Sequence, residues 1–91
     1  MAQPDQPIPR ELEELIESLA ERVHEKWADG RRAEGWQYGP HRNDVQKTHP
    51  CLIPYSELED SEREYDRATA RETILAIVDL GWEIRRRKDS E

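Results

Sequence analysis

Apolar residues in the first third of the chain recur at steps of three and four. The members of this series are Leu12, Leu15, Ile16, Leu19, Ala20, Val23 and Trp27. This spacing places them on one stripe of an amphipathic helix that begins near Arg10. Glutamates follow in the first turn, where negative charge is favourable, and Gly30 or Gly35 is expected to end the helix.

A second helix is predicted in the last third of the chain. Ser61 and Glu64 have the spacing of a capping box, in which both side chains satisfy backbone amides at the start of a helix. Its expected buried stripe consists of Ala70, Ile74, Ile77 and Val78. Gly81 is suited to the position just after the helix. Trp82 and Ile84 then alternate with charged residues, which favours a short strand or an extended tail that packs back on the helices.

The segment between the two helices, residues 36–55, has no clear period. Three prolines interrupt it, and an irregular stretch of this length is often functional in a compact domain. Glycines on both sides of Trp36 and Tyr38 favour a tight backbone that buries both rings. The apolar residues expected to anchor the loop in the core are Leu52, Ile53 and Tyr55.

The length of 91 residues corresponds to one domain with a modest core. We expect a proline-containing lead-in at residues 1–9, the domain at 10–85 and a charged tail at 86–91. A core of this size would gain stability from a second copy of the chain or from another partner.

The formal net charge of −7 comes from the two helical flanks, whereas the middle of the chain is close to neutral. An acidic chain is a poor candidate for non-specific nucleic-acid binding, which needs a basic surface. A single cysteine excludes an internal disulfide and fits a reducing compartment. No apolar run reaches transmembrane length and the first residues lack a signal-peptide pattern, so we expect a cytoplasmic protein without a membrane partner.

Most of the candidate chemistry lies in the segment His24–Tyr55, which contains every histidine and the cysteine. Trp27 is either a core aromatic or a stacking surface for a planar ring. His24 precedes it by three residues, so both side chains can border one patch. Arg31 and Arg42 can pair with a phosphate or a carboxylate. The alternative for these arginines is pairing with the acidic residues of the flanks.

A zinc-dependent or thiol hydrolase is a further alternative. Its zinc ligands would be His41, His49 and Cys51, with His24 as the fourth, but this spacing is not one of the usual metal patterns. Cys51 lies between a proline and a leucine, a setting that suits an inert thiol. No phosphate-binding glycine motif and no hydrolase signature is present in the sequence. We therefore expect no enzymatic activity, no metal and no cofactor.

Several spaced elements resemble the RyR domain, the repeat named after ryanodine receptor channels and also found in bacterial and phage proteins. The elements are His24–Ala28, Arg31, Gly35–Gly39, Arg42, Lys47, His49–Pro50, Leu52–Tyr55, Tyr65–Arg67 and Leu80–Ile84. Together they cover roughly residues 10–85. The chain resembles a free-standing, single-copy member of the prokaryotic or phage type.

The resemblance implies a mainly α fold, with two principal antiparallel helices, a long ordered loop between them and minor short β structure. In the channels such repeats occur in tandem pairs, which a homodimer of this chain would recreate. Adenine-nucleotide-like and aromatic ligands are associated with some pairs, which implies a ligand site on Trp27 with His24, Arg31 and Arg42. The implied function is a non-enzymatic sensor of a nucleotide-like small molecule, and the alternative is a structural or protein–protein interaction module without a ligand.

Overall fold

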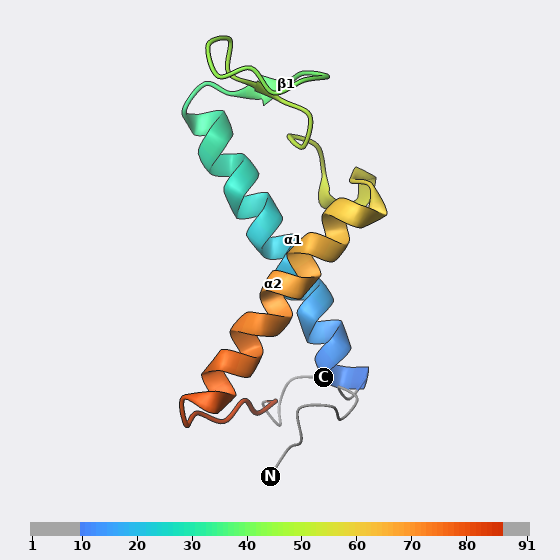
Figure 1. The fold of residues 1–91 in the computed structure, drawn as a ribbon, viewed down its shortest axis with the longest axis vertical. Coiled ribbons are helices and arrows are strands. Elements are labelled where there is room, and N and C mark those ends of the chain that lie inside the picture. Colours follow the sequence, from blue (N-terminus) through green and yellow to red (C-terminus); the bar gives the residue numbers. More distant parts are fainter. Residues whose placement is uncertain (1–9, 87–91) are drawn as a thin grey trace.

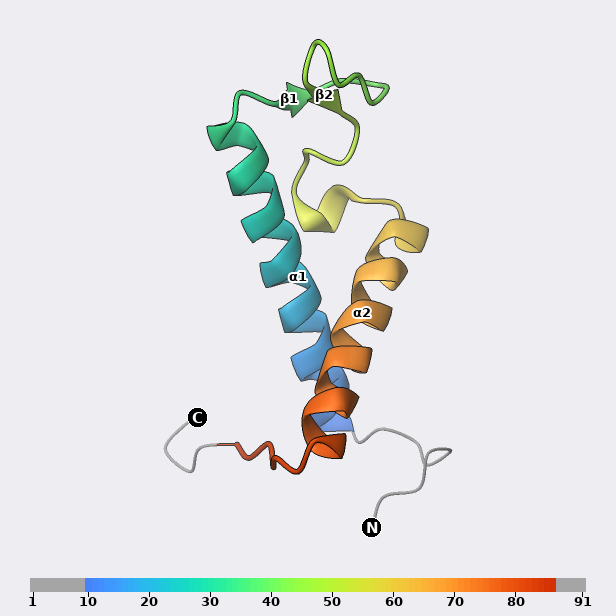
Figure 2. The same cartoon turned by 60° about the vertical axis from the view of Figure 1, so that its left-hand side comes forward.

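The computed structural model describes residues 10–86 and contains two long helices. Helix α1 spans Arg10–Ala33 and helix α2 spans Asp60–Asp79. The helices run in opposite directions, and the first half of α1 crosses the middle of α2 (Figures 1 and 2). The predicted lead-in at 1–9 and nearly all of the predicted tail lie outside the described residues.

The chain between the helices forms an ordered loop above their diverging upper ends (Figure 2). Strand β1 (Gln37–Tyr38) pairs in parallel with strand β2 (Thr48–His49), and a single 3-10 turn, η1 (Tyr55–Glu57), follows. The predicted mainly α fold, with two antiparallel helices, a long ordered loop and minor short β structure, is therefore confirmed.

The core consists of two small clusters along the inner side of α1. At the helix crossing, Ile16 packs against Ala70 and Ile74 of α2. One turn further along α1, Ala20 packs against Tyr55 and Leu58, with Cys51 and Ile53 at the border. The predicted anchoring of the loop is confirmed, because Leu52 and Tyr55 are buried and Ile53 is half-buried.

The apolar stripes extend beyond the region where the helices touch. Val23 was predicted to be buried on α1, but its side chain is largely exposed. Ile77 and Val78 were predicted to be buried on α2, and both are exposed. These predictions were wrong because the two helices contact each other around one crossing and then diverge (Figure 1). A charge-assisted hydrogen bond also joins the helices at the crossing, where Arg67 Nε donates to Glu17 Oε1 at 2.6 Å.

Helix α1 ends in a Schellman motif at Gly35, one of the two glycines predicted to end it. Gly35 has a φ of +95°, in the left-handed region that glycine adopts without a steric penalty. Its amide donates to the carbonyl of Arg32, and the amide of Trp36 donates to the carbonyl of Arg31, both at 3.0 Å. This hydrogen-bond pattern brings Trp36 back toward the last turn of α1.

Helix α2 begins two residues earlier than a capping box at Ser61 requires. Its N-cap is Glu59, and no side chain caps the first amides, so the capping-box prediction was wrong. Leu58, directly before the cap, is buried in the core and fixes where the chain enters the helix. At the other end, Gly81 follows the helix with a φ of +101° in a second Schellman motif, as predicted.

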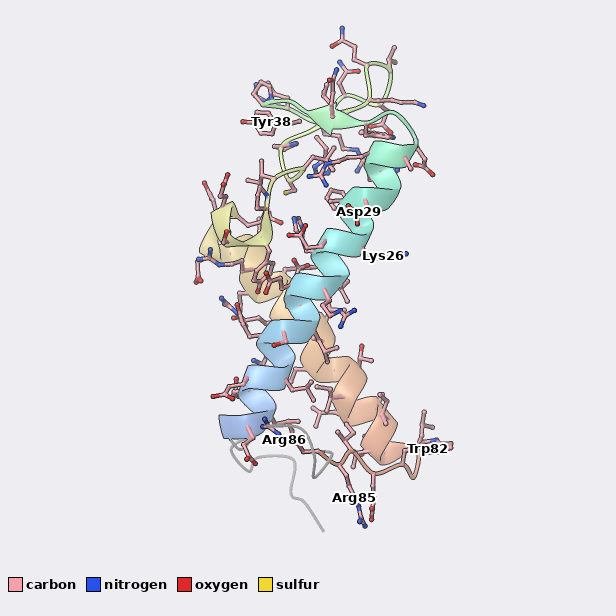
Figure 3. All side chains as sticks on the ribbon, turned by 180° about the vertical axis from the view of Figure 1, so that it is seen from behind. Lys26, Asp29, Tyr38, Trp82, Arg85 and Arg86 are labelled. Carbon is pink, nitrogen blue, oxygen red and sulfur yellow. The ribbon has the colours of Figure 1, made fainter. Side chains whose placement is uncertain are left out.

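The chain after Gly81 forms no strand within the described residues 82–86. Trp82 is 70% exposed and projects away from α1 in Figure 3, so the prediction that it packs back on the helices was wrong. Ile84 and Arg86 do return to the first turns of α1, where they border a groove of about 600 Å³ with Leu12 and Leu15.

Gly39 is a site where the loop tolerates no side chain. A Cβ atom built at Gly39 would lie 2.6 Å from Thr48 Cβ, across the β1–β2 pairing. We expect Gly39→Ala to destabilise the protein by about 1–3 kcal/mol, the usual cost of overpacking, in urea unfolding followed by circular dichroism. Gly30→Ala is the matched control, since a Cβ there meets nothing within 4 Å. That helix-interior variant should be neutral or stabilising, and equal losses in both variants would contradict the assignment.

Candidate ligand-binding site

His24 joins α1 to the loop from a buried position. Its side chain is 5% exposed, and Nε2 donates to the carbonyl oxygen of Ile53 at 2.8 Å. Because a carbonyl only accepts, this bond places the proton of the neutral imidazole on Nε2. The ring centroid lies 5.7 Å from that of Trp27 and 6.1 Å from that of Tyr55. His24 therefore connects the core cluster around Tyr55 with the aromatic residues further along α1.

His49 lies between two tryptophans. Its ring meets Trp27 edge-on, with centroids 5.1 Å apart and an interplanar angle of 76°, and its centroid is 6.5 Å from that of Trp36. The amide of Cys51 donates to His49 Nδ1 at 3.1 Å. Strand β2 thus brings the imidazole against the last turns of α1, although His49 and Trp27 are far apart in the sequence.

The guanidinium group of Arg31 lies over the indole ring of Trp36. Its guanidinium carbon lies 5.1 Å from the centroid of the Trp36 ring, a cation–π contact. The Schellman motif produces this contact because its hydrogen bond joins the backbones of these same two residues. Arg31 also approaches Glu34 at 3.6 Å, where the side chain of Glu34 is largely exposed and that of Arg31 is partly buried.

Arg42 reaches the same region from the loop. Its Nε donates to Asp44 Oδ1 at 2.9 Å in an exposed pair, and this bond lowers the pKa of the Asp44 carboxyl. The turn that carries both residues is held by Asn43, whose Oδ1 accepts from two following backbone amides. Lys47, at a left-handed φ of +60°, closes the turn and donates from Nζ to the carbonyl of Glu34 at the end of α1.

The electrostatics of the region act on His49. Partial burial lowers the pKa of its imidazole, and the positive charges of Arg42 and Arg31 lower it further. Glu62 and Asp44 act in the opposite direction without reversing the shift. The neutral ring is therefore favoured in the folded protein. Protonation of His49 costs folding stability as the pH falls below the ordinary histidine value of about 6.5.

A family comparison matches nearly the whole of this chain. The model of the RyR domain matches residues 5–86, which include both helices, the loop and every aromatic contact described above. The chain belongs to the RyR domain family. The resemblance recognised in the spaced sequence elements is thereby confirmed.

Five side chains of this RyR domain make up what we call the aromatic–cationic cluster. They are Trp27, Arg31, Trp36, Arg42 and His49. Four of them share ring or cation–π contacts, and the fifth, Arg42, is near enough for its charge to act on His49. Of the four residues predicted to bind a ligand, Trp27, Arg31 and Arg42 fall in the cluster. His24 lies beside it on the buried side, where its Nε2 is already bonded to the loop.

Sequence reasoning missed two members of the cluster. Trp36 was interpreted as core, yet it is half-buried and exposes part of its ring beneath Arg31. The glycine before it was the available signal, because a Schellman motif brings the second residue after the helix back to the last turn. His49 was considered as a metal ligand alone.

Tyr38 was also predicted to lie in the core, but it is 58% exposed and stands at the outer edge of the loop (Figure 3).

The alternative zinc site has no geometric basis in the described part of the chain. Across residues 10–86, no three His, Cys, Asp or Glu side chains converge as a metal site requires. His41 is exposed, whereas His49 Nδ1 is occupied by the amide of Cys51. Burial, and then the nearby Glu62 carboxylate, raise the pKa of the Cys51 thiol, which opposes formation of a nucleophilic thiolate.

An open groove of about 830 Å³ adjoins Trp27 on the outer side of α1. Its lining includes Arg22, Val23 and Lys26 as well as Trp27 itself. Lys26 projects from α1 on the side opposite the loop (Figure 3). Trp27 therefore contacts His49 on one side and lines this open groove on the other. Neither helix described in the structure is sufficiently long and apolar to cross a membrane.

Proposed function

We propose that this RyR domain is a non-catalytic module that binds a planar, anionic, nucleotide-like small molecule at the aromatic–cationic cluster. One observation carries the proposal. Two indoles, one imidazole and two guanidinium groups gather from α1, the end of α1 and the loop, in a chain whose net charge is −7. Indole rings supply stacking surfaces for a base, and guanidinium groups supply paired donors for phosphate.

The arginines are available to a ligand at low energetic cost. Arg31 and Arg42 each pair with an exposed carboxylate, and such surface pairs contribute little because water screens them. A hydrogen bond to a charged group contributes about 1.5–3 kcal/mol, and stacking of a base on an aromatic ring about 1–3 kcal/mol. A phosphate that replaces Glu34 and Asp44 therefore has a net advantage.

Ligand binding would also join the loop to the helix. Arg42 extends from the turn between β1 and β2, whereas Arg31 and Trp27 belong to α1. An anion held by both arginines would restrict that turn relative to α1. A module of this kind reports its ligand through the position of the turn, which is the physical basis for a sensor function.

Isothermal titration with ADP tests the proposal. We expect saturable binding with one site per chain and a dissociation constant in the micromolar to millimolar range. Adenosine, which lacks the charge, and pyrophosphate, which lacks the base, should each bind more weakly than ADP. Absence of ADP binding, or equal binding of adenosine, would contradict the proposed anionic site.

A protein-interaction module is the second candidate, and the exposed apolar residues at the end of α2 favour it. The large side chains exposed there are Leu75, Ile77, Val78, Leu80 and Trp82. Exposed tryptophan and leucine on a small domain are common at sites where proteins associate. The simplest occupant is a second copy of this chain, because two copies would bury the same patch around a twofold axis.

Replacement of Trp82 by aspartate is expected to weaken self-association without unfolding the domain, because Trp82 is largely exposed. Sedimentation equilibrium should show a concentration-dependent dimer for the wild type and a shift toward monomer, of about tenfold or more in dissociation constant, for Trp82→Asp. Tyr65→Asp is the matched control, since Tyr65 is an equally exposed aromatic at the other end of α2. A monomeric wild type, or an equal effect of Tyr65→Asp, would rule out this dimer.

A further inference from the structure

His49 differs from the other members of the aromatic–cationic cluster because one of its ring nitrogens already accepts a hydrogen bond from the backbone. The amide of Cys51 donates to Nδ1 at 3.1 Å, so Nδ1 must be the acceptor and the proton of the neutral ring must be on Nε2. Among the hydrogen bonds of residues 10–86, the only one made by the His49 ring is the bond at Nδ1, and Nε2 has no protein partner there. The ring therefore presents one free donor beside Trp27 and Trp36.

We propose that His49 is a specificity-determining residue of this site: a neutral imidazole, held in one tautomer by Cys51, that donates from Nε2 to an oxygen of the ligand's phosphate group. The inference rests on the proposed anion-binding function and deepens it. In this arrangement Arg31 and Arg42 balance the charge of the ligand, while the hydrogen bond from His49 fixes the orientation of the phosphate group. A fixed donor favours a ligand whose acceptor oxygen reaches the ring when its base is stacked on a tryptophan.

The groups that face His49 favour the neutral form of its imidazole on balance. Arg31 on α1 and Arg42 in the loop disfavour a further positive charge, and partial burial does the same. Asp44 in the loop and Glu62 on α2 favour protonation, but the pKa of His49 remains below its ordinary value. Protonation would also place a second N–H group on Nδ1, directly against the donating amide of Cys51.

Two substitutions separate the donor of His49 from its ring. His49→Phe keeps a flat ring between the tryptophans and removes the donor. His49→Gln loses the ring, but its side-chain amide can place an N–H group near the position of Nε2. We expect His49→Phe to weaken ADP binding by about 10-fold to 100-fold, as loss of a hydrogen bond to a charged group implies, and His49→Gln to recover part of that loss. His41→Phe is the matched control, because His41 is an exposed histidine of the same loop.

Nitrogen NMR of the imidazole provides a measurement that a purely structural role would not change. In the free protein at neutral pH, we expect His49 to show an unprotonated Nδ1 and a protonated Nε2. Addition of ADP should shift the Nε2 resonance, as a new hydrogen bond requires, and leave Nδ1 unprotonated.

Each outcome of these experiments bears on a separate statement. If ADP binds but His49→Phe binds it as well as the wild type, or if ADP protonates Nδ1, the role of His49 as a neutral donor is wrong while the proposed function stands. If the wild type binds no ADP, the proposed function fails and the role of His49 fails with it.

Discussion

Replacement of Ile16 by alanine is expected to remove a large part of the folding free energy of this domain. Ile16 is 1% exposed at the helix crossing, and it packs against Ala70 and Ile74. Truncation of a buried isoleucine costs about 2–5 kcal/mol, because the lost contacts leave a cavity. A domain of this length has a total stability of only about 5–14 kcal/mol. Urea unfolding followed by far-UV circular dichroism should therefore show a much lower midpoint.

The size of this effect follows from the small number of residues that share the core. The crossing cluster contains three buried residues, and the second cluster contains three more. The neighbours of Ile16 cannot fill the cavity easily, since the helices diverge on both sides of the crossing (Figure 1). Leu80→Ala is the control, because Leu80 is 78% exposed and its loss should change stability by no more than about 0.5 kcal/mol. A loss below about 1 kcal/mol for Ile16→Ala would show that the helix crossing contributes little.

Replacement of Trp27 by leucine is expected to weaken ADP binding by about 10-fold to 100-fold, the contribution of stacking one base on an aromatic ring. Leucine retains apolar volume on α1 but loses the flat surface and the edge-on contact with His49. Trp27 is half-buried, so the conservative change limits the accompanying loss of stability. Titration calorimetry at one temperature, with folding verified by circular dichroism, would measure the difference.

A second tryptophan variant shows whether the effect is local. Trp82→Leu removes an exposed indole at the opposite end of the molecule from the cluster (Figure 3). It should bind ADP as well as the wild type does, and it would also simplify the assignment of any fluorescence change. If Trp27→Leu binds ADP normally, the ligand does not stack on Trp27. If Trp82→Leu weakens binding equally, the ligand occupies another part of the surface.

The candidate site was only partly predictable from the sequence. Trp27 and Arg31 lie four residues apart on one helix, so their proximity follows from helical periodicity alone. Trp36 was recognisable in principle, because Gly35 ends the helix in a motif of known geometry. The position of His49 was not, since it depends on the parallel pairing of two strands of two residues each. Such short strands leave no periodic pattern in the sequence.

The contrast between His24 and His49 also shows that contacts made by the loop cannot be predicted from residue type alone. Both are histidines near Trp27, and residue type alone suggests similar roles. In the folded protein His24 is buried and its Nε2 donates to the carbonyl of Ile53, whereas His49 accepts at Nδ1 and its other nitrogen has no partner within the described part of the chain. Backbone groups of the loop decide which nitrogen of each ring is occupied, and the loop conformation is a property of the whole fold.

The sequence by itself determined the two helices, the glycines that end them, the anchoring residues of the loop and the family. Each of these depends on local spacing or on residue type, which the chain carries directly. Tertiary structure alone decided where the helices cross, and so left Val23, Ile77 and Val78 exposed on stripes that look uniformly buried. It also decided that His49 and Arg42 approach the end of α1. The physical reason is that periodicity defines which side chains share a face, whereas the position of the partner along that face depends on contacts between residues far apart in the chain.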